Sequence, residues 1–141
     1  MIVKLIGFGG ERKPEYNTYQ DAGADVWTTE EVTIPDGRVG CVGLGWGIEL
    51  PQGTFAAVWP RSGKTLEGLI CQLPPIDSGY RGEIHAMIAN LSGKEVTIPK
   101  GTKIGQLVVQ PYIRVEYQTE EEMAGLEDRG TNWAGSSDKK A

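Results

Sequence analysis

The chain has 141 residues, with 14 basic and 19 acidic side chains and a formal net charge of −5 at pH 7. This length is typical of a single domain, and the acidic balance argues against binding to a nucleic-acid backbone. No apolar run approaches the roughly 18 residues that a membrane-spanning helix needs, and the apolar stretch after Met1 is too short for a signal peptide. We therefore expect a cytoplasmic domain without nucleic-acid or membrane partners.

Glycine accounts for 20 of the 141 residues, and there are eight prolines. The glycine share is about 14%, against a usual value of about 7%. Because both residues destabilise helix interiors, the composition favours an all-β domain with many tight turns. We expect Cys41 and Cys71 to be buried apolar residues of a reducing compartment. With His85, they are too few for a structural zinc site.

Short apolar segments separated by turn residues predict the strands. A polar stretch over 11–20 is expected to be a surface loop, and turn signals such as Pro35-Asp36-Gly37 and Pro99-Lys100-Gly101 separate later segments. The regular spacing is typical of a sandwich, a barrel or a jelly roll. The predicted strands cover residues 2–6, 24–27, 31–34, 38–44, 46–50, 55–59, 84–90, 95–98 and 104–117.

Two short helices are predicted. One begins after Pro60 and is limited by Gly68. The other opens at a capping box formed by Thr119 and Glu122 and ends near Gly125. From about residue 128 the composition changes to small and charged residues. On composition alone, this segment is as consistent with a disordered terminus as with an ordered one.

Four places along the chain could carry chemistry, and each also has an ordinary structural explanation. Arg61 and Ser62 follow Pro60 and could bind an anion at a helix start, or form a plain helix start with an exposed arginine. Asp77 could orient a water, or only close a turn. Asp25 could face a hydrated Mg²⁺, or cap a turn. Gln106 could point to a site or to solvent.

The order and spacing of five segments are more specific than any one of them. They read AGADV (22–26), PRSG (60–63), IDSGYRGEI (76–84), GTKIGQLVV (101–109) and RGTNWAGSS (129–137). This series resembles the five motifs of the trimeric dUTPases. The resemblance implies an all-β, jelly-roll-like (β-clip) fold with one or two short helices. It also implies a homotrimer that hydrolyses dUTP to dUMP and diphosphate with Mg²⁺ at sites between subunits.

The resemblance further implies a role for each matching residue in the body of the chain, taken as 1–127. Asp77 would position the attacking water, with Gln106 near that water and the α-phosphate. Tyr80 would pack beneath the deoxyribose. Asp25 would hold Mg²⁺ through its waters. The remaining substrate-binding residues of this part are Arg61, Ser62, Gly63 and Ile76.

The segment 128–141 would be a flexible C-terminal arm that closes over an active site. Its implied substrate-binding residues are Arg129, Trp133 and Ser136. Trp133 stands where the family usually has glycine, and Ala134 stands where it has the aromatic residue that stacks on the base. Trp133 could therefore stack on the base after a one-residue slip, or anchor the arm on a neighbouring subunit.

A second departure concerns the hairpin that binds the base in the family. Pro74-Pro75 stands in place of the usual Gly-Val, and a proline has no N–H to donate. This leaves two alternatives to dUTP hydrolysis. One is a diphosphatase for another pyrimidine deoxynucleotide, such as dCTP or one with a modified base. The other is a nucleotide-sensing binding protein on the same fold.

Overall fold

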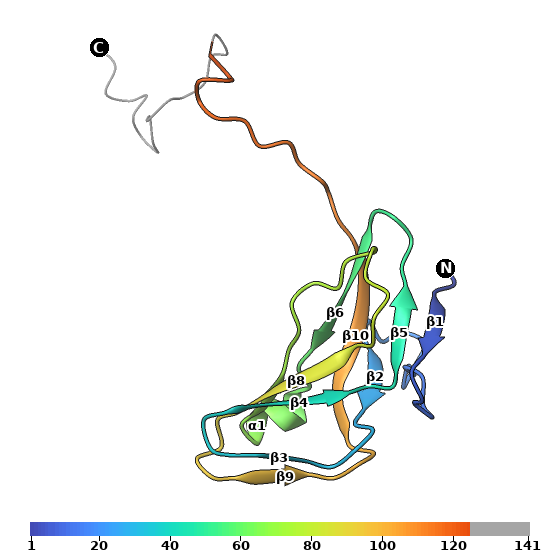
Figure 1. Ribbon diagram of the computed structural model, residues 1–141, viewed down its shortest axis with the longest axis vertical. Coiled ribbons are helices and arrows are strands. Elements are labelled where there is room, and N and C mark those ends of the chain that lie inside the picture. The colour runs from blue at the N-terminus through green and yellow to red at the C-terminus, as the bar shows by residue number, and fades with distance from the viewer. Residues whose placement is uncertain (125–141) are drawn as a thin grey trace, which may run out of the picture.

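The computed structural model describes residues 1–124 (Figure 1). Within them the chain forms ten short strands and one helix, in agreement with the glycine-rich composition. The strands are β1 (Lys4–Gly7), β2 (Ala24–Trp27), β3 (Val32–Ile34), β4 (Val39–Gly43), β5 (Trp46–Glu49), β6 (Thr54–Trp59), β7 (Leu69–Cys71), β8 (His85–Asn90), β9 (Val96–Ile98) and β10 (Lys103–Pro111). The helix is α1 (Ser62–Leu66).

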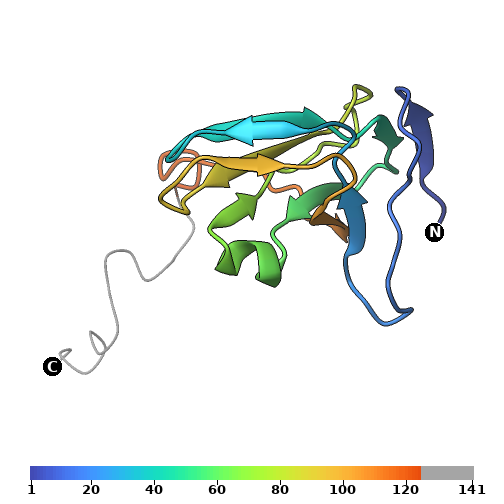
Figure 2. The same cartoon turned by 90° about the horizontal axis from the view of Figure 1, so that it is seen from below.

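The strands pair in antiparallel fashion into four small sheets that enclose one core. The sheets have the orders β1-β5, β2-β10-β6, β3-β9 and β4-β8-β7. Seen from below in Figure 2, the sheets wrap around a common interior instead of lying in one plane. Strands from all four sheets contribute buried side chains to it, among them Val26, Ile34, Val42, Ile48, Val58, Ile88, Ile98 and Ile104. The fold is the expected all-β, jelly-roll-like one.

The sheet β2-β10-β6 has an irregularity where β10 begins. Lys103 pairs with Trp27, whereas Gly105 already pairs with Val26, so the register shifts between these two residues of β10. Ile104 is fully buried, and a Cβ on Gly105 would lie 3.0 Å from Val58 and 3.2 Å from the Cys71 Sγ. Two consecutive residues thus face the core, which is the signature of a β-bulge.

The helix α1 confirms the prediction of a short helix after Pro60. Arg61 is its N-cap residue, in an extended conformation and without a side-chain cap. The helix ends just before Gly68, whose φ of +86° is a conformation that favours glycine. The five-residue helix therefore fits between a proline and a glycine, as the sequence predicts.

Several sequence predictions are corrected by the structure. The strand predicted over 104–117 ends at Pro111, because its partner β6 begins at Thr54 and offers no further backbone to pair with. The second helix does not form within residues 1–124. The Thr119 Oγ1 does accept the Glu122 N–H at 3.2 Å, but the residues from 120 to 124 form a turn.

Two further corrections concern residues around β7 and β4. The strand β7 was not predicted, since three residues are too few to show an alternating pattern. Cys41 is exposed on β4, so the prediction that both thiols are buried is wrong for Cys41 and confirmed for Cys71. His85 lies at the start of β8 with an exposed side chain, as expected of a residue on a strand face.

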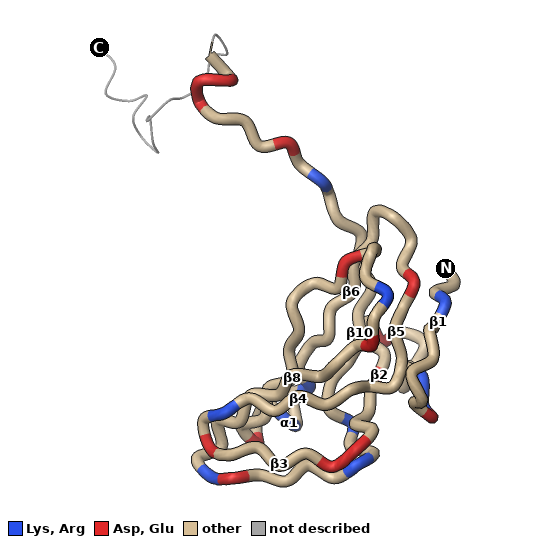
Figure 3. The backbone as a smooth tube through the Cα atoms, viewed as in Figure 1, with Lys and Arg blue, Asp and Glu red and all other residues tan. Residues whose placement is uncertain are grey.

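Charged side chains lie mostly in the turns and loops around the sheets. Figure 3 shows both acidic and basic residues where β3 and β9 are joined to the rest of the domain. Within residues 1–124, no helix has the length and apolar character required to cross a membrane.

Candidate functional site

A polar cavity of about 380 Å³ opens on the outer face of the sheet β2-β10-β6, beside the start of α1. We call it the charged pocket. It gathers residues that lie more than 80 positions apart in the sequence, from three of the five motifs. Its lining residues are Asn17, Asp21, Ala22, Gly23, Asp25, Arg61, Ser62, Lys103 and Gln106.

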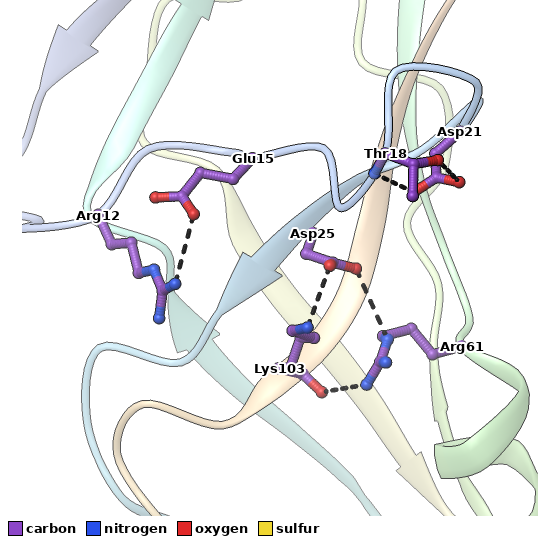
Figure 4. Close-up of polar contacts among 7 residues, drawn as sticks. All are labelled: Arg12, Glu15, Thr18, Asp21, Asp25, Arg61 and Lys103. Atoms are coloured by element: carbon purple, nitrogen blue, oxygen red, sulfur yellow. Dashed lines mark hydrogen bonds and ion pairs between the residues drawn. The ribbon is translucent and has the colours of Figure 1, made fainter.

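Asp25 lies at the centre of the charged pocket, on β2, and contacts two cationic side chains. Its Oδ1 lies 3.7 Å from the Arg61 Nε, and its Oδ2 lies 3.3 Å from the Lys103 Nζ. The Arg61 Nη1 also donates to the Lys103 carbonyl at 3.2 Å, which closes a ring of three residues (Figure 4). The carboxylate is 14% exposed, so the ring still faces the cavity.

Gln106 of β10 lies opposite Asp25 in the sheet and is fixed from two sides. Its Nε2 donates to the Pro60 carbonyl at 2.9 Å. Gly23 lies so close that a Cβ there would be 2.9 Å from the Gln106 Cβ, so this position leaves no room for a larger residue. The side-chain amide is therefore held beside Arg61 and not free in solvent.

On the other side of Gln106, the register of the sheet brings in Trp59 of β6. Asp25, Gln106 and Trp59 thus form one cross-strand row, since residues directly opposite one another share a face. The Trp59 side chain is 48% exposed. The sequence analysis did not single out Trp59, whose only signal was its place directly before Pro60.

Two more acidic groups lie near this pocket, as Figure 4 shows. The Asp21 carboxylate accepts the Thr18 N–H at 2.9 Å and the Thr18 Oγ1 at 2.8 Å. These hydrogen bonds, the backbone one above all, hold the pKa of Asp21 below its usual range. Glu15 pairs with Arg12 at 3.4 Å. Both carboxylates thus have partners in their own loop.

A second cavity, of about 240 Å³, lies along the segment between β7 and β8. We call it the apolar pocket, because its lining is mainly apolar. It contains the third motif, with Asp77 and Tyr80. Its lining residues are Leu73, Pro74, Pro75, Ile76, Asp77, Tyr80, Glu83, Ile84, His85 and Met87.

The segment that carries Asp77 is tied to the open edge of β6. The Leu73 N–H donates to the Val58 carbonyl at 3.2 Å, and Ile76 exchanges two hydrogen bonds with Ala56, at 2.7 and 3.1 Å. Asp77 comes directly after these hydrogen bonds, at the point where the chain leaves the edge of β6. The turn is closed by the Tyr80 N–H, which donates to the Asp77 carbonyl at 3.1 Å.

Tyr80 and the edge of β8 form the other wall of the apolar pocket. The Tyr80 hydroxyl donates to the Glu83 carbonyl at 2.9 Å, so the ring is fixed and 46% exposed. Ile84 bonds to Trp46 and Leu44 with its N–H and C=O. Because successive residues of a strand direct these groups to opposite sides, those of His85 face the pocket.

The two pockets share no lining residue. The structure brings Asp25, Arg61, Ser62 and Gln106 together in one, and Ile76, Asp77 and Tyr80 in the other. Gly63 lies in the first turn of α1, outside both linings. Arg129, Trp133 and Ser136, and the boundary between body and arm, lie outside the residues that the structure describes.

The side chains around Asp25 suit a metal ion that keeps its waters. Within residues 1–124 no group of three His, Cys, Asp or Glu side chains could hold a metal directly. Mg²⁺ keeps several waters and binds through one or two carboxylates together with substrate phosphates. A single, partly exposed carboxylate on the wall of an open polar cavity fits that mode of binding.

The fold and the two pockets define a jelly-roll-like β protein with one mainly apolar cavity and one polar cavity, in which Arg61 and Lys103 lie beside Asp21 and Asp25. The family model described as dUTPase matches residues 12–138. A deoxyuridine 5′-triphosphate nucleotidohydrolase of Clostridium tetani is 37% identical over 129 residues, covering 89% of this chain and 88% of its own. That of Crocosphaera subtropica is 40% identical over 127 residues, with 88% and 89% covered. The chain belongs to the dUTPase family.

Solved structures agree on the fold. The dUTPase of Staphylococcus bacteriophage 80alpha, solved with dUpNHpp, has a TM-score of 0.77 and 24% identity, covering 96% of this chain and 98% of its own. The phage phi11 dUTPase, whose structure describes the coordination of a structural Mg(II) ion, has a TM-score of 0.76 and 23% identity, with 86% and 98% covered.

Proposed function

We propose that this chain hydrolyses dUTP to dUMP and diphosphate, at a site that combines the charged pocket with the apolar pocket. The observation that carries the proposal is the convergence of Asp25, Arg61, Ser62 and Gln106 in one cavity. These residues come from three motifs of the family, and a structure without that function has no need to assemble them. The names of the relatives support the same reaction.

The charged pocket binds the triphosphate. Arg61 supplies a planar guanidinium suited to phosphate oxygens, and Ser62 adds a hydroxyl at the start of α1. Gln106, held by the Pro60 carbonyl, faces the α-phosphate and the attacking water. Asp25 would hold Mg²⁺ through water, and the ion would supply positive charge to neutralise the phosphates.

The apolar pocket binds the nucleoside. Tyr80 packs beneath the deoxyribose and leaves no room for a 2′-hydroxyl, while Ile76 lines the same cavity. Asp77 accepts a proton from the attacking water and orients it. Pro74 and Pro75 have no N–H, and those of Leu73 and Ile76 bond to β6, so the edge of β8 at His85 supplies the backbone groups for the base.

Each active site is shared between subunits of a homotrimer, as the resemblance to the trimeric dUTPases implies, and the two pockets of one site come from different subunits, which fits their separate linings. The C-terminal segment supports such an assembly. Residues 111–124 are all exposed and leave the domain (Figure 1), with Ile113 at 88% and Tyr117 at 89% exposure. Exposed apolar side chains of this kind mark contacts with another chain.

The body, residues 1–127, then carries an arm, 128–141, that closes over a site with Arg129, Trp133 and Ser136.

The reaction is tested by diphosphate release in the presence of Mg²⁺ from dUTP, dCTP, dTTP and UTP, side by side. We expect turnover of dUTP, with UTP rejected at Tyr80. Preference for dCTP would mean that the edge of β8 recognises cytosine instead of uracil. Pro74 and Pro75, which have no N–H to donate, would take no part in this recognition. No turnover with any nucleotide, together with a raised Tm in the presence of one, would favour a nucleotide sensor.

The sharing of the site is tested by combining two inactive variants, Asp77→Asn and Arg61→Gln, in one assembly. Co-expressed with different tags and purified as mixed trimers, they place an intact Asp77 beside an intact Arg61 in some sites. Each mixed trimer then holds one intact site of its three, so about one third of the wild-type activity is expected. If both residues served one site within a single subunit, the mixture would be as inactive as its components.

A further inference from the structure

Lys103 lies in the charged pocket because of the bulge in β10. Side chains of a regular strand alternate between its two faces, so Lys103 and Gln106, three positions apart, would point in opposite directions. The bulge turns both Ile104 and Gly105 toward the core and restores Lys103 to the face of Gln106. Bulges commonly re-aim a side chain beside an active site.

The contacts of Lys103 hold its ammonium group at the mouth of the cavity. Its Nζ lies 3.3 Å from the Asp25 Oδ2, while its own carbonyl accepts a hydrogen bond from Arg61 at 3.2 Å. Its side chain is 39% exposed, and that of Arg61 is 34% exposed. Both cations thus face the space where the triphosphate is placed, and both are anchored on the same carboxylate (Figure 4).

We propose that Lys103 is a second triphosphate-binding residue beside Arg61, and that Asp25 holds its ammonium in place until the substrate arrives. The proposal rests on the proposed function, since it names a further contact in that same site. A half-exposed ion pair stabilises a protein only slightly, whereas charge-assisted hydrogen bonds to phosphate are among the strong ones. Transfer of the ammonium from Asp25 to a phosphate oxygen is therefore favourable.

The same transfer leaves one oxygen of Asp25 without its cation. That oxygen is then free to face the hydrated Mg²⁺ that accompanies the triphosphate. In the free protein Lys103 supplies a positive charge to this oxygen, while Arg61 pairs with the other oxygen of Asp25. Asp21 does not compete for Lys103, because Thr18 already donates two hydrogen bonds to its carboxylate.

The test measures binding of inorganic triphosphate in EDTA by isothermal titration calorimetry, so that neither metal nor turnover contributes. The variants are Lys103→Met, which removes the charge, and Lys103→Arg, which keeps it. Lys100→Met is the matched control, because Lys100 is exposed three residues away and outside the charged pocket. Each is also made in an Asp25→Asn background, where the ion pair is already absent.

We expect Lys103→Met to weaken triphosphate binding about tenfold or more, the scale of one lost charge-assisted contact. Lys103→Arg should stay within about threefold of the wild type, and Lys100→Met within about twofold. The loss on Lys103→Met should persist in the Asp25→Asn background, because Lys103 itself touches the phosphate. If the loss disappears there, or never occurs, Lys103 only positions Asp25 and the proposal is wrong.

Diphosphate release from dUTP by the wild-type chain is measured on the same preparations. If the wild type hydrolyses dUTP but Lys103→Met binds triphosphate normally, the proposed function stands and the assignment of Lys103 fails. If Lys103→Met loses triphosphate binding while the wild type releases no diphosphate, the assignment stands and the proposed function fails.

Discussion

The charged pocket and the apolar pocket are built in different ways. In the charged pocket, Asp25, Lys103 and Gln106 stand on neighbouring strands of one sheet, so the ladder of backbone hydrogen bonds fixes their spacing. In the apolar pocket, Asp77 and Tyr80 stand on an irregular segment that is tied to β6 mainly through Leu73 and Ile76. Charge is thus placed on the sheet, and the reacting carboxylate is placed on a loop.

This difference has a physical reason. A cation, a carboxylate and an amide must be held at set distances around a polyphosphate, and a sheet does this without further cost. A carboxylate that contacts both sugar and water must reach out from the scaffold, which a loop on a rigid support allows. Substitutions in the charged pocket should therefore act on binding, and those in the apolar pocket on the chemical step and the choice of base.

The largest effect is expected for Asp77→Asn. An amide cannot accept a proton from the attacking water, so kcat should fall at least about 10³-fold, while dUTP still binds through the charged pocket. Single-turnover kinetics and calorimetric binding of dUTP separate the two quantities. Activity near that of the wild type would show that Asp77 does not activate the water. The proposed division, with binding in the charged pocket and chemistry in the apolar pocket, would then also be wrong.

Deletion of residues 128–141 should come next. If the arm closes over the two pockets and adds Arg129 to the charge around the phosphates, its loss should lower kcat by about 10²–10³-fold. The trimer should persist, which light scattering measures on the same sample. Full activity of the truncated chain would mean that the two pockets work without a lid.

The motifs single out residues in the linings of both pockets, and Asp25, Arg61, Ser62 and Gln106 lie in one cavity. Their roles in binding and catalysis stay predictions. Lys103 was missed for a physical reason. Strand alternation counted from Gln106 assigns it to the opposite face, and only the paired structure reveals the bulge that reverses this.

Other differences arise where local patterns depend on distant partners. The strand predicted to reach 117 keeps its alternating pattern, but the pairing edge of β6 ends opposite Pro111. Cys41 is typical of a buried residue by type, yet it stands on the outward face of β4, whose buried residue is Val42. In both cases the neighbouring strand decides, and a single sequence does not show where that strand ends.

A smaller effect is expected for Gly23→Ala, which tests how rigidly the sheet holds Gln106. The added Cβ would lie 2.9 Å from the Gln106 Cβ, so the amide must move away from the Pro60 carbonyl. We expect kcat/KM for dUTP to fall about 10-fold or more with an unchanged far-UV spectrum. Gly7→Ala is the control, because a Cβ there meets no atom of residues 1–124 within 4 Å. Equal activity of both variants would show that the charged pocket tolerates displacement of Gln106.

The smallest effect concerns Cys71, which packs in the core between β7 and the bulge of β10. It is the last residue of β7, directly before the segment of the apolar pocket, and its Sγ lies 3.2 Å from the Cβ position of Gly105 in the bulge. Cys71 is fully buried, whereas Cys41 is exposed. A thiol reagent should therefore modify one cysteine in the native protein and two in denaturant, if the core around Cys71 is as closed as the packing indicates.

The same burial makes stability depend on pH. Burial raises the pKa of the Cys71 thiol from 9.0 to about 12, because the thiolate loses its hydration. The folded state therefore keeps a proton that the unfolded state releases above pH 9, so the thiol's contribution to stability is complete below pH 9 and is lost as the pH rises toward 12. Urea unfolding at pH 8 and pH 10 should show this decrease in the wild type and in Cys41→Ser, and less of it in Cys71→Ala. An equal decrease in all three would mean that water reaches Cys71, and that the core beside the bulge of β10 opens in the native protein.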